Sequence, residues 1–272
     1  MSLLSMNQVS TFRWSLDQDV ERYCQAGYDG IGVWRQKLAD YGEQEGIELI
    51  RASGLRATNL MWAGGFTGSD GRSVEESVAD AAEAIRTAAA LEAPCLVLYS
   101  GGRNNHILSH AARLLRAALD PLVDLAGELD VTLAIEPMHA ACAADWTFLT
   151  DVESALDFVQ SYDAPHLQLA IDSYHFAHDQ ALLANLDQIV PWTALVHLGD
   201  RREPHGIDHN RAPLGTGRLP LMGFIQGLRD AGYAGDFDVK LLGREFDPRR
   251  YDALLHGSRE FFERCAAPVE SK

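Results

Sequence analysis

Residues 131–136 read Val-Thr-Leu-Ala-Ile-Glu, an apolar run of strand length that ends in a carboxylate. The same form returns at residues 167–172 (Leu-Gln-Leu-Ala-Ile-Asp) and, with an imidazole near its end, at residues 194–198 (Ala-Leu-Val-His-Leu). Such runs, separated by longer amphipathic stretches, are typical of strands in a sheet that helices cover. The polar side chain that ends each run indicates that one end of this sheet carries chemistry.

Runs of the same kind occur along the whole chain, at residues 30–34, 57–62, 95–99 and 237–242, with a weaker one at 7–12. Helix-like segments lie between the runs, at residues 16–26, 37–53, 74–91, 108–129, 151–161, 179–186, 219–231 and 249–265. Eight strands that alternate with eight helices predict parallel βαβ units. Eight units in a chain of about 250 residues favour a closed (β/α)8 TIM barrel, and the alternative is a doubly wound open sheet.

Length and composition favour a single α/β domain. The chain has 272 residues, of which 47% are hydrophobic, and this is enough for a full-sized core. No linker, low-complexity tract or charge run divides it, so we expect one domain over residues 1–272. The opening Met-Ser-Leu resembles a cloning remnant, with Met6 as a candidate natural start, so residues 1–5 are expected to be tag-derived or disordered.

Charge and cysteine usage narrow the classes of partner. The formal net charge of −16 repels phosphate backbones and anionic lipid heads, so we expect neither nucleic acid nor membrane as a partner. The four cysteines are scattered and form no CxxC motif, which favours reduced thiols and a cytoplasmic protein. The sequence has no apolar run of about 18 residues and no visible secretory signal.

Three polar side chains mark a candidate site. Glu136, Asp172 and His197 lie at or near the ends of three successive predicted strands. A further polar group follows each of them three residues later: His139, His175 and Asp200. Because strand C-termini meet at the mouth of a TM barrel, we expect these groups to gather there. Such oxygen and nitrogen ligands suit a divalent metal (Mn2+, Mg2+, Co2+ or Zn2+), whereas the alternative is polar caps that bond only to loop backbone.

Longer motifs carry a family resemblance. Ile-Glu-Pro-Met-His at 135–139, Asp-Ser-Tyr-His at 172–175, Val-His-Leu-Gly-Asp at 196–200 and Leu-Gly-Thr-Gly at 214–217 resemble the sugar phosphate isomerase/epimerase family, which has a xylose isomerase-like barrel. Ala-Gly-Tyr-Asp-Gly-Ile-Gly-Val-Trp at 26–34 extends the match, so it covers nearly the whole chain. Ketose 3-epimerases, inosose dehydratase and endonuclease IV are relatives. The order and spacing of the motifs identify the family, and they do not identify the substrate.

The resemblance implies roles for particular residues. In the epimerase relatives a Glu, an Asp, a His and a final Glu hold one divalent metal, and the first three match Glu136, Asp172 and His197. His175 and Arg211 would then hold substrate oxygens. Relatives are often dimers or tetramers, so the resemblance also implies a homo-oligomer.

The chain departs from the family on the last strand. The family pattern there is roughly Tyr-Glu-Val-Glu, whereas this chain has Phe-Asp-Val-Lys at 237–240, so Lys240 stands in place of the last ligand. A charged ammonium does not ligate metal. Either three ligands keep a metal with water in the gap, or the ammonium replaces the charge of the metal and pairs with Glu136 and Asp172. Asp238 is a candidate partner of Lys240, and Glu245 lies close enough in sequence to reach the site.

Other residues are candidates for the substrate site. Trp34 and Trp62, with Trp14 and Trp146, lie at or just past predicted strand ends, where their rings would stack on a sugar, and His139 is a further candidate substrate contact. The glycine-rich segment 63–68 is either a lid or a plain turn. Segment 100–106 has the character of a phosphate-holding loop, but it lacks the ending of a P-loop.

These observations predict an isomerase or epimerase of carbohydrate metabolism that acts on a ketose or an oxidised polyol by proton abstraction beside a carbonyl. Glu136 and Lys240 are the expected catalytic residues, and a small-molecule sugar or polyol is the expected partner. A dehydratase of the inosose dehydratase type and a non-catalytic sugar-binding paralogue are the alternatives, the latter because of Lys240. Endonuclease IV is disfavoured, because Asn59, Met61 and Tyr99 stand where its histidines would be.

Overall fold

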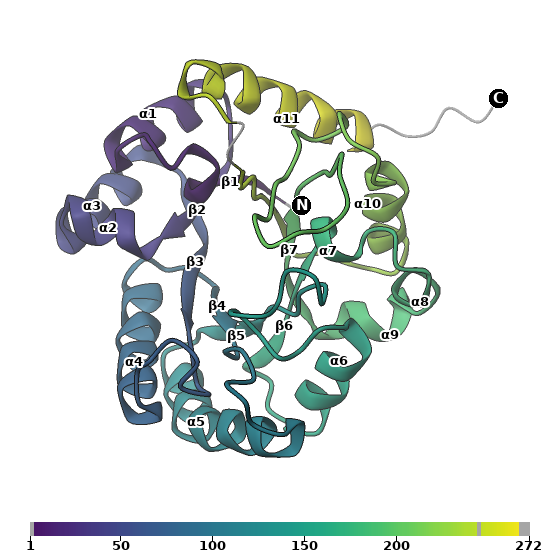
Figure 1. Cartoon of the computed structure of the whole chain (residues 1–272). Coiled ribbons are helices and arrows are strands. Elements are labelled where there is room, and N and C mark those ends of the chain that lie inside the picture. Colours follow the sequence, from purple (N-terminus) through teal and green to yellow (C-terminus); the bar gives the residue numbers. More distant parts are fainter. Residues whose placement is uncertain (1–2, 244–245, 267–272) are drawn as a thin grey trace.

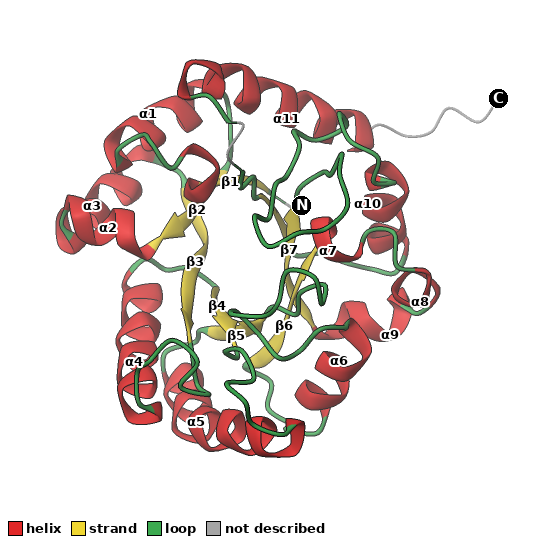
Figure 2. Ribbon diagram, viewed as in Figure 1, coloured by secondary structure: helices red, strands yellow, loops and turns green. Residues whose placement is uncertain are grey.

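Eight parallel strands form a closed barrel in the computed structural model, which describes residues 3–243 and 246–266. The strands pair in chain order, and β1 closes the ring against β8. Figures 1 and 2 show the strands at the centre of a ring of helices. This confirms the predicted TIM barrel over the open sheet. The strands are β1 (Leu4–Asn7), β2 (Gly30–Trp34), β3 (Arg56–Gly64), β4 (Cys95–Tyr99), β5 (Thr132–Ile135), β6 (Leu167–Asp172), β7 (Thr193–Leu198) and β8 (Asp236–Val239).

Helices surround the barrel and cover the outer face of its strands (Figure 2). The α-helices are α1 (Leu16–Gln25), α2 (Arg35–Tyr41), α3 (Glu43–Ser53), α4 (Val74–Ala90), α5 (Leu108–Glu128), α6 (Val152–Gln160), α7 (Ser173–Phe176), α8 (Gln180–Ala184), α9 (Leu186–Ile189), α10 (Leu221–Asp230) and α11 (Tyr251–Ala266). Three 3₁₀ helices complete the set: η1 (Gln8–Thr11), η2 (Val190–Trp192) and η3 (Pro248–Arg250). Within the described residues, no helix has the length and apolarity that a membrane span requires.

The core has two parts. The larger apolar cluster fills the layer between strands and helices. A smaller cluster, which includes Met61, Val97 and Leu195, fills the barrel interior on the side of β3 to β7. Polar side chains, among them Asn7 and Asp238, occupy the interior between β1 and β8 and are fully buried. Side chains therefore fill the interior of the barrel, and the polar ones within it lie mainly near β1 and β8.

In the N-terminal half of the chain, the structure differs from the sequence-based assignments at the first strand and at the helix expected at 37–53. The first strand is Leu4–Asn7 rather than residues 7–12, because the Asn7 side chain accepts a hydrogen bond from the Val9 amide and the chain turns into η1. Leu4 and Ser5, placed by sequence in a segment expected to be tag-derived or disordered, lie in β1 and pair with β8. The helix expected at 37–53 is split in two by Gly42, whose φ of 109° a helix does not permit.

Later elements also differ from the predictions in their bounds. The helix expected at 179–186 is two short helices, α8 and α9, because Asn185 leaves helical geometry between them. The last strand stops at Val239, so Lys240 lies directly past its C-terminal end. The other expected strands and helices match the structure to within a few residues at either end.

A buried ion pair ties the loop after β1 to the surrounding helices. Lys37 of α2 lies 2.6 Å from Asp19 of α1, and its ammonium also donates to the backbone oxygens of Gln8 and Thr11. Burial raises the pKa of Asp19 to about 6, although Lys37 and three hydrogen bonds act in the opposite direction. Lys37 therefore fixes η1, the segment that follows β1 at the mouth of the barrel.

We expect Lys37→Met to lower the free energy of unfolding by about 3–5 kcal/mol, because it leaves a buried carboxylate without its cation. Urea denaturation of the variant and of the neighbouring surface variant Gln36→Met measures this. Gln36 is exposed, so its replacement should change the free energy of unfolding by less than about 0.5 kcal/mol. An equal effect of the two variants would show that the pair contributes no stability.

Candidate active site

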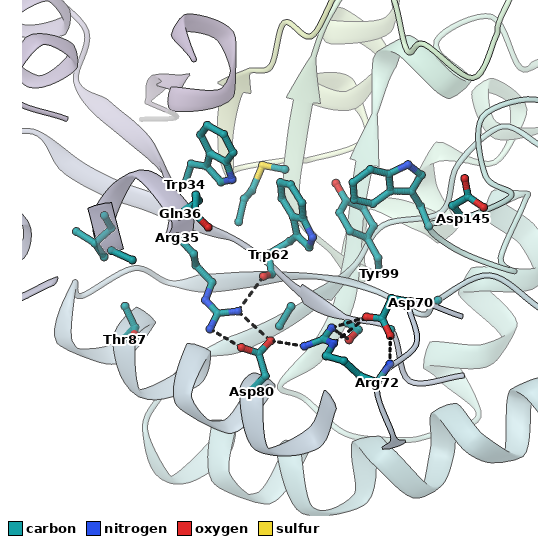
Figure 3. Close-up of a pocket in the computed structure, with 18 of the residues that line it drawn as sticks. Trp34, Arg35, Gln36, Trp62, Asp70, Arg72, Asp80, Thr87, Tyr99 and Asp145 are labelled. Carbon is teal, nitrogen blue, oxygen red and sulfur yellow. Dashed lines mark hydrogen bonds and ion pairs between the residues drawn. The ribbon is translucent and has the colours of Figure 1, made fainter. Parts of the chain in front are cut away.

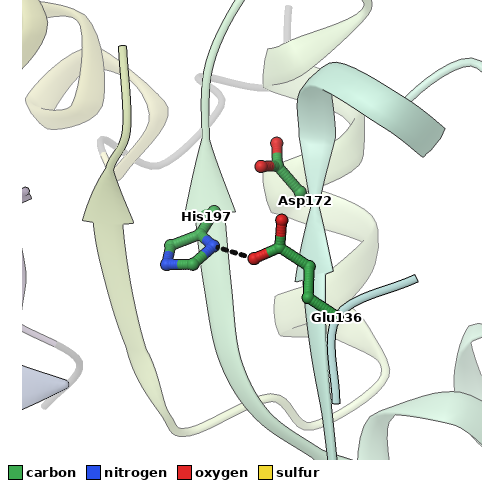
Figure 4. Close-up of side chains that lie close together, drawn as sticks. All are labelled: Glu136, Asp172 and His197. Carbon is green, nitrogen blue, oxygen red and sulfur yellow. Dashed lines mark hydrogen bonds and ion pairs between the residues drawn. The ribbon is translucent and has the colours of Figure 1, made fainter. Parts of the chain in front are cut away.

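The polar strand ends meet at the mouth of the barrel, as the sequence predicts. Asp172 ends β6, His197 lies in β7, and Glu136 and Lys240 directly follow β5 and β8. Figure 4 shows Glu136, Asp172 and His197 pointing toward one another from adjacent strands. All four side chains are almost completely buried, since none is more than 1% exposed. Neighbouring parallel strands thus bring groups together that are up to 104 residues apart in the chain.

Lys240 occupies the centre of this group. Its Nζ donates to Glu136 Oε1 at 2.7 Å and Oε2 at 2.9 Å, and to the Tyr99 hydroxyl at 3.2 Å. The same Nζ lies 3.4 Å from Asp172 Oδ2 and 3.3 Å from His197 Nδ1. The sequence left two alternatives open for Lys240. The structure has the arrangement in which its ammonium pairs with the carboxylates of Glu136 and Asp172.

Arg211 forms the second ion pair of the site. Its Nη1 donates to Asp172 Oδ1 at 2.8 Å, and its Nη2 lies 2.8 Å from Asp172 Oδ2. The guanidinium also lies over the ring of Tyr174, 4.5 Å from its centroid. Arg211 belongs to the long segment between β7 and α10, which lies over the strand ends in Figure 1. That segment therefore places the guanidinium of Arg211 at the mouth of the barrel.

Asp200 holds this segment in place rather than contacting the cluster. Its carboxylate accepts hydrogen bonds from the amides of Arg201, Gly217 and Leu219, and its backbone pairs with Ala212. A Cβ at Gly217 would lie 2.2 Å from Asp200 Oδ1, so the turn needs glycine. The Leu-Gly-Thr-Gly motif at 214–217 therefore has a structural role, because its turn positions the segment that carries Arg211.

His197 links the two carboxylates on either side of it. Its Nδ1 lies 2.8 Å from Glu136 Oε2, and its Nε2 lies 3.4 Å from Asp238 Oδ2. Asp238 in turn accepts hydrogen bonds from three buried side chains: Ser5, Asn7 and Asn59. Asp238 therefore faces β1, β3 and β7 and is not the partner of Lys240 that the sequence suggested. Residues two apart on a strand lie in successive layers, which separates the two side chains.

The charges set the protonation of the cluster. Burial alone raises the pKa of Glu136, but Lys240 and His197 outweigh it and lower that pKa to about 2. Burial likewise opposes ionisation of Asp172, whereas Arg211 and Lys240 lower its pKa well below the ordinary value. Burial and Lys240 lower the pKa of His197, but Glu136 and Asp238 raise it above its usual value. Both carboxylates are therefore ionised at neutral pH.

His175 is a buried group without a partner. It is fully buried in α7, and neither of its ring nitrogens has a hydrogen-bond partner among the described residues. Burial and Arg211 lower its pKa well below the ordinary value, so the imidazole is neutral. The unpartnered buried atoms of the described residues also include others at this mouth: Asn59 Oδ1, His209 Nε2 and Arg211 Nε. Native interiors rarely leave such atoms unpaired, so these are the atoms at this mouth to which water or a polar ligand would bond.

A cavity of about 550 Å³ lies beside the cluster, at the ends of β2 to β4. Trp34, Trp62, Tyr99 and Trp146 line it, and Figure 3 shows Trp34, Trp62 and Tyr99 among its lining residues. The rings of Trp62, Tyr99 and Trp146 pack with centroids 5.3–5.8 Å apart. Tyr99 faces the cavity and also touches Lys240, so it is the boundary between the cavity and the buried charges.

The remaining predicted residues lie around this mouth. His139 is half-buried in the loop after β5 and stacks on His205, with centroids 3.9 Å apart, and none of its described contacts is with the ion pairs. Segment 63–68 is packed, since Phe66 is fully buried and Thr67 donates to Gly102. Glu245 lies outside the described residues. Sequence reasoning used Tyr99 only to disfavour the endonuclease, although its place at the end of β4 was a signal for the site.

Three of these side chains form a candidate donor set for a divalent metal. Glu136, Asp172 and His197 each offer one ligand atom, and these atoms lie within 4.8 Å of one another, so the three could hold an ion. However, Lys240 Nζ already lies within 3.4 Å of all three side chains, and Arg211 engages both oxygens of Asp172. With Lys240 in this position, the donor types suit a metal but the space and the charge do not.

The fold and this site define a class of protein. Residues 20–256 match the model of the xylose isomerase-like TIM barrel family, and the chain belongs to that family. The resemblance found in the motifs is thereby confirmed.

Individual relatives are similar over different lengths. A D-psicose 3-epimerase of Enterocloster bolteae is 30% identical over 133 residues, which are 48% of this chain and 40% of that protein. The chain thus aligns with less than half of this curated relative. A solved structure of a protein from Sinorhizobium meliloti 1021 is 26% identical with a TM-score of 0.88, and the match covers 96% of this chain and 98% of that one. The structure of the IOLI protein, which contains a zinc atom, is 19% identical with a TM-score of 0.85, covering 99% and 100%.

The charge of Glu136 predicts a pH dependence. Its pKa of about 2 in the folded protein lies below its ordinary value of 4.5, so its contribution to stability is present above pH 4.5 and is lost as the pH falls toward 2. We therefore expect the stability difference between the wild type and Glu136→Gln to shrink by about 1 kcal/mol from about pH 6 to about pH 3.5. Urea denaturation across this range measures it.

Glu128→Gln, the same substitution at an exposed position of α5, is the matched control for the change of a glutamate to glutamine. A difference for Glu136→Gln that stays constant, or grows as the pH falls, would contradict the lowered pKa.

Proposed function

We propose that the protein is a sugar isomerase or epimerase that acts on a ketose or an oxidised polyol by removing a proton beside the carbonyl. The observation that carries this proposal is the Glu136–Lys240 pair, a carboxylate and an ammonium 2.7 Å apart at the mouth of the barrel and next to a cavity. A base and a cation at this separation are what abstraction of such a proton requires.

In the proposed reaction Glu136 takes the proton from the carbon beside the carbonyl. The electron pair of the broken C–H bond forms the carbon–carbon double bond, and the carbonyl π electrons move to oxygen, which gives an enediolate. The Lys240 ammonium stabilises that oxygen in a site that excludes water. Return of a proton from the Lys240 ammonium to the opposite face of the same carbon gives the epimer, and the proton on Glu136 then passes to the neutral Lys240, 2.7 Å away. Return of the Glu136 proton to the neighbouring carbon gives the isomer, while the hydroxyl proton of the enediolate moves to the other oxygen.

The pairing of Glu136 with Lys240 controls its strength as a base. In the structure the Lys240 ammonium donates to both oxygens of Glu136, which makes this carboxylate a weak base. A substrate oxygen that accepts a hydrogen bond from Lys240 draws the ammonium away, and Glu136 then becomes more basic at the moment when the substrate is bound. Tyr99, which contacts both groups, accepts or donates as this exchange occurs.

Other residues have substrate-binding roles in this proposal. His175 has two free ring nitrogens and Arg211 has an unpartnered Nε, so both offer hydrogen bonds to hydroxyl or carbonyl oxygens. Trp34 and Trp62 line the cavity, where their faces suit the C–H side of a sugar. His139, which stacks on His205, meets only an extended substrate. The D-psicose 3-epimerase relative supports ketoses as the first substrates to test.

The first experiment incubates the protein with ketohexoses and inososes in D2O and follows the products by mass spectrometry and NMR. We expect incorporation of solvent deuterium at the carbon beside the carbonyl, with the molecular formula otherwise unchanged. Glu136→Gln should reduce the rate by about 100-fold or more, because it removes the base, whereas the exposed Glu128→Gln should not change it.

The outcomes separate the competing functions. A product one water lighter would identify a dehydratase, which begins with the same proton removal. Saturable sugar binding without exchange would identify a binding paralogue. Exchange at an undiminished rate in Glu136→Gln would exclude Glu136 as the base.

A further inference from the structure

The three residues that could hold a divalent ion already surround a cation of the chain itself. Lys240 Nζ lies 2.7 Å from Glu136, 3.3 Å from His197 Nδ1 and 3.4 Å from Asp172. These are the same side chains whose ligand atoms lie within 4.8 Å of one another. The three hydrogens of the ammonium have acceptors in the two Glu136 oxygens and the Tyr99 hydroxyl. The position that suits an ion is thus filled by a group whose own bonding is complete.

We infer that Lys240 replaces a divalent metal at the mouth of the barrel, and that the identity of residue 240 alone decides whether this site holds a metal. Where the inference assigns Lys240 the task of stabilising a substrate oxygen, it rests on the proposed function. The exclusion of metal does not depend on turnover, because it follows from charge and space in the folded protein.

The charge balance favours the ammonium. The carboxylates of Glu136 and Asp172 are balanced one for one by Lys240 and Arg211, so these four side chains are neutral without an added ion, and Asp238 lies on the far side of His197. A divalent cation beside these four residues would leave an excess of two positive charges. All four side chains are no more than 1% exposed, so water does not screen that excess.

The backbone and the aliphatic stem of Lys240 are also held in place. The backbone amide of Lys240 donates to Leu198 O at 2.9 Å, and its carbonyl accepts from Arg211 Nη1 at 3.2 Å. The aliphatic stem is enclosed within the barrel mouth, since the residue is 1% exposed. In this conformation the Lys240 ammonium is therefore held away from solvent.

The same geometry predicts that a glutamate at position 240 creates a metal site. A glutamate side chain is one atom shorter than lysine, so its carboxylate oxygen reaches the position of the lysine Cε. An ion bonded to that oxygen at about 2.0–2.2 Å falls near the present position of Nζ, within reach of Glu136, Asp172 and His197. Four protein ligands then surround it, and the added negative charge offsets part of the charge of the ion.

The test measures metal content and affinity in three proteins: wild type, Lys240→Glu and Lys240→Met. Each is incubated with Mn2+ or Zn2+, desalted and analysed for metal, and binding is measured by calorimetry. We expect less than about 0.1 ion per chain in the wild type and about one ion per chain in Lys240→Glu. Lys240→Met, which removes the ammonium without adding a ligand, should bind at least about 10-fold more weakly than Lys240→Glu.

A second substitution assigns any metal to this site. Glu136→Ala added to Lys240→Glu should abolish the binding, whereas metal held by the histidines of the surrounding loops would remain. About one tightly held ion per wild-type chain that Glu136→Ala removes would overturn the inference, and this result does not require any position-240 variant to fold. If Lys240→Glu is folded by circular dichroism and binds no metal, the inference fails in its second part.

The proposed function and this inference can fail separately. A metal-free wild type that exchanges no proton would refute the proposed function and leave the inference intact. A wild type that needs a metal at Glu136 for turnover would refute the inference and leave the proposed isomerase or epimerase activity intact.

Discussion

The ion pair between Lys240 and Glu136 is the interaction on which the rest of the site depends. Two charges removed from water cost several kcal/mol each, and their attraction repays this cost only when further partners complete the geometry. Tyr99 completes the shell of the ammonium, and His197 completes that of the carboxylate. The pair is therefore stable only because four strands of the barrel converge on one point.

The neighbouring charges are arranged as a consequence of that pair. Arg211 balances Asp172, which would otherwise be a second uncompensated carboxylate near Glu136. Asp238 takes the far side of His197 and is held by hydrogen bonds from β1 and β3. The unpartnered nitrogens of His175 stand apart from this balanced network. The site thus combines complete ion pairs with an imidazole that has no hydrogen-bond partner among the described residues.

The fold was accessible from sequence because its signals are local. Apolar runs such as Cys95–Tyr99 and Leu167–Asp172 were placed to the residue, since strand length and composition reflect burial by covering helices. The first strand was misplaced because Val9 and Thr11 are β-branched and lie two residues apart, a pattern that favours a strand, whereas the Asn7 side chain turns the backbone into a 3₁₀ helix. Gly42 similarly broke a helix that the hydrophobic pattern alone made continuous.

The sequence by itself determined the barrel and which strands end in Glu136, Asp172 and His197, because alternation and strand-end polarity are properties of short segments. It also identified Lys240 as the departure, and left open whether that residue joins a metal or replaces it. Only the tertiary structure decided that Lys240 lies among the three ligand candidates, that Tyr99 borders them and that Asp238 turns to His197. Those contacts join β4 to β8 across the interior, and their distances follow from barrel closure and side-chain layering, which no local pattern encodes.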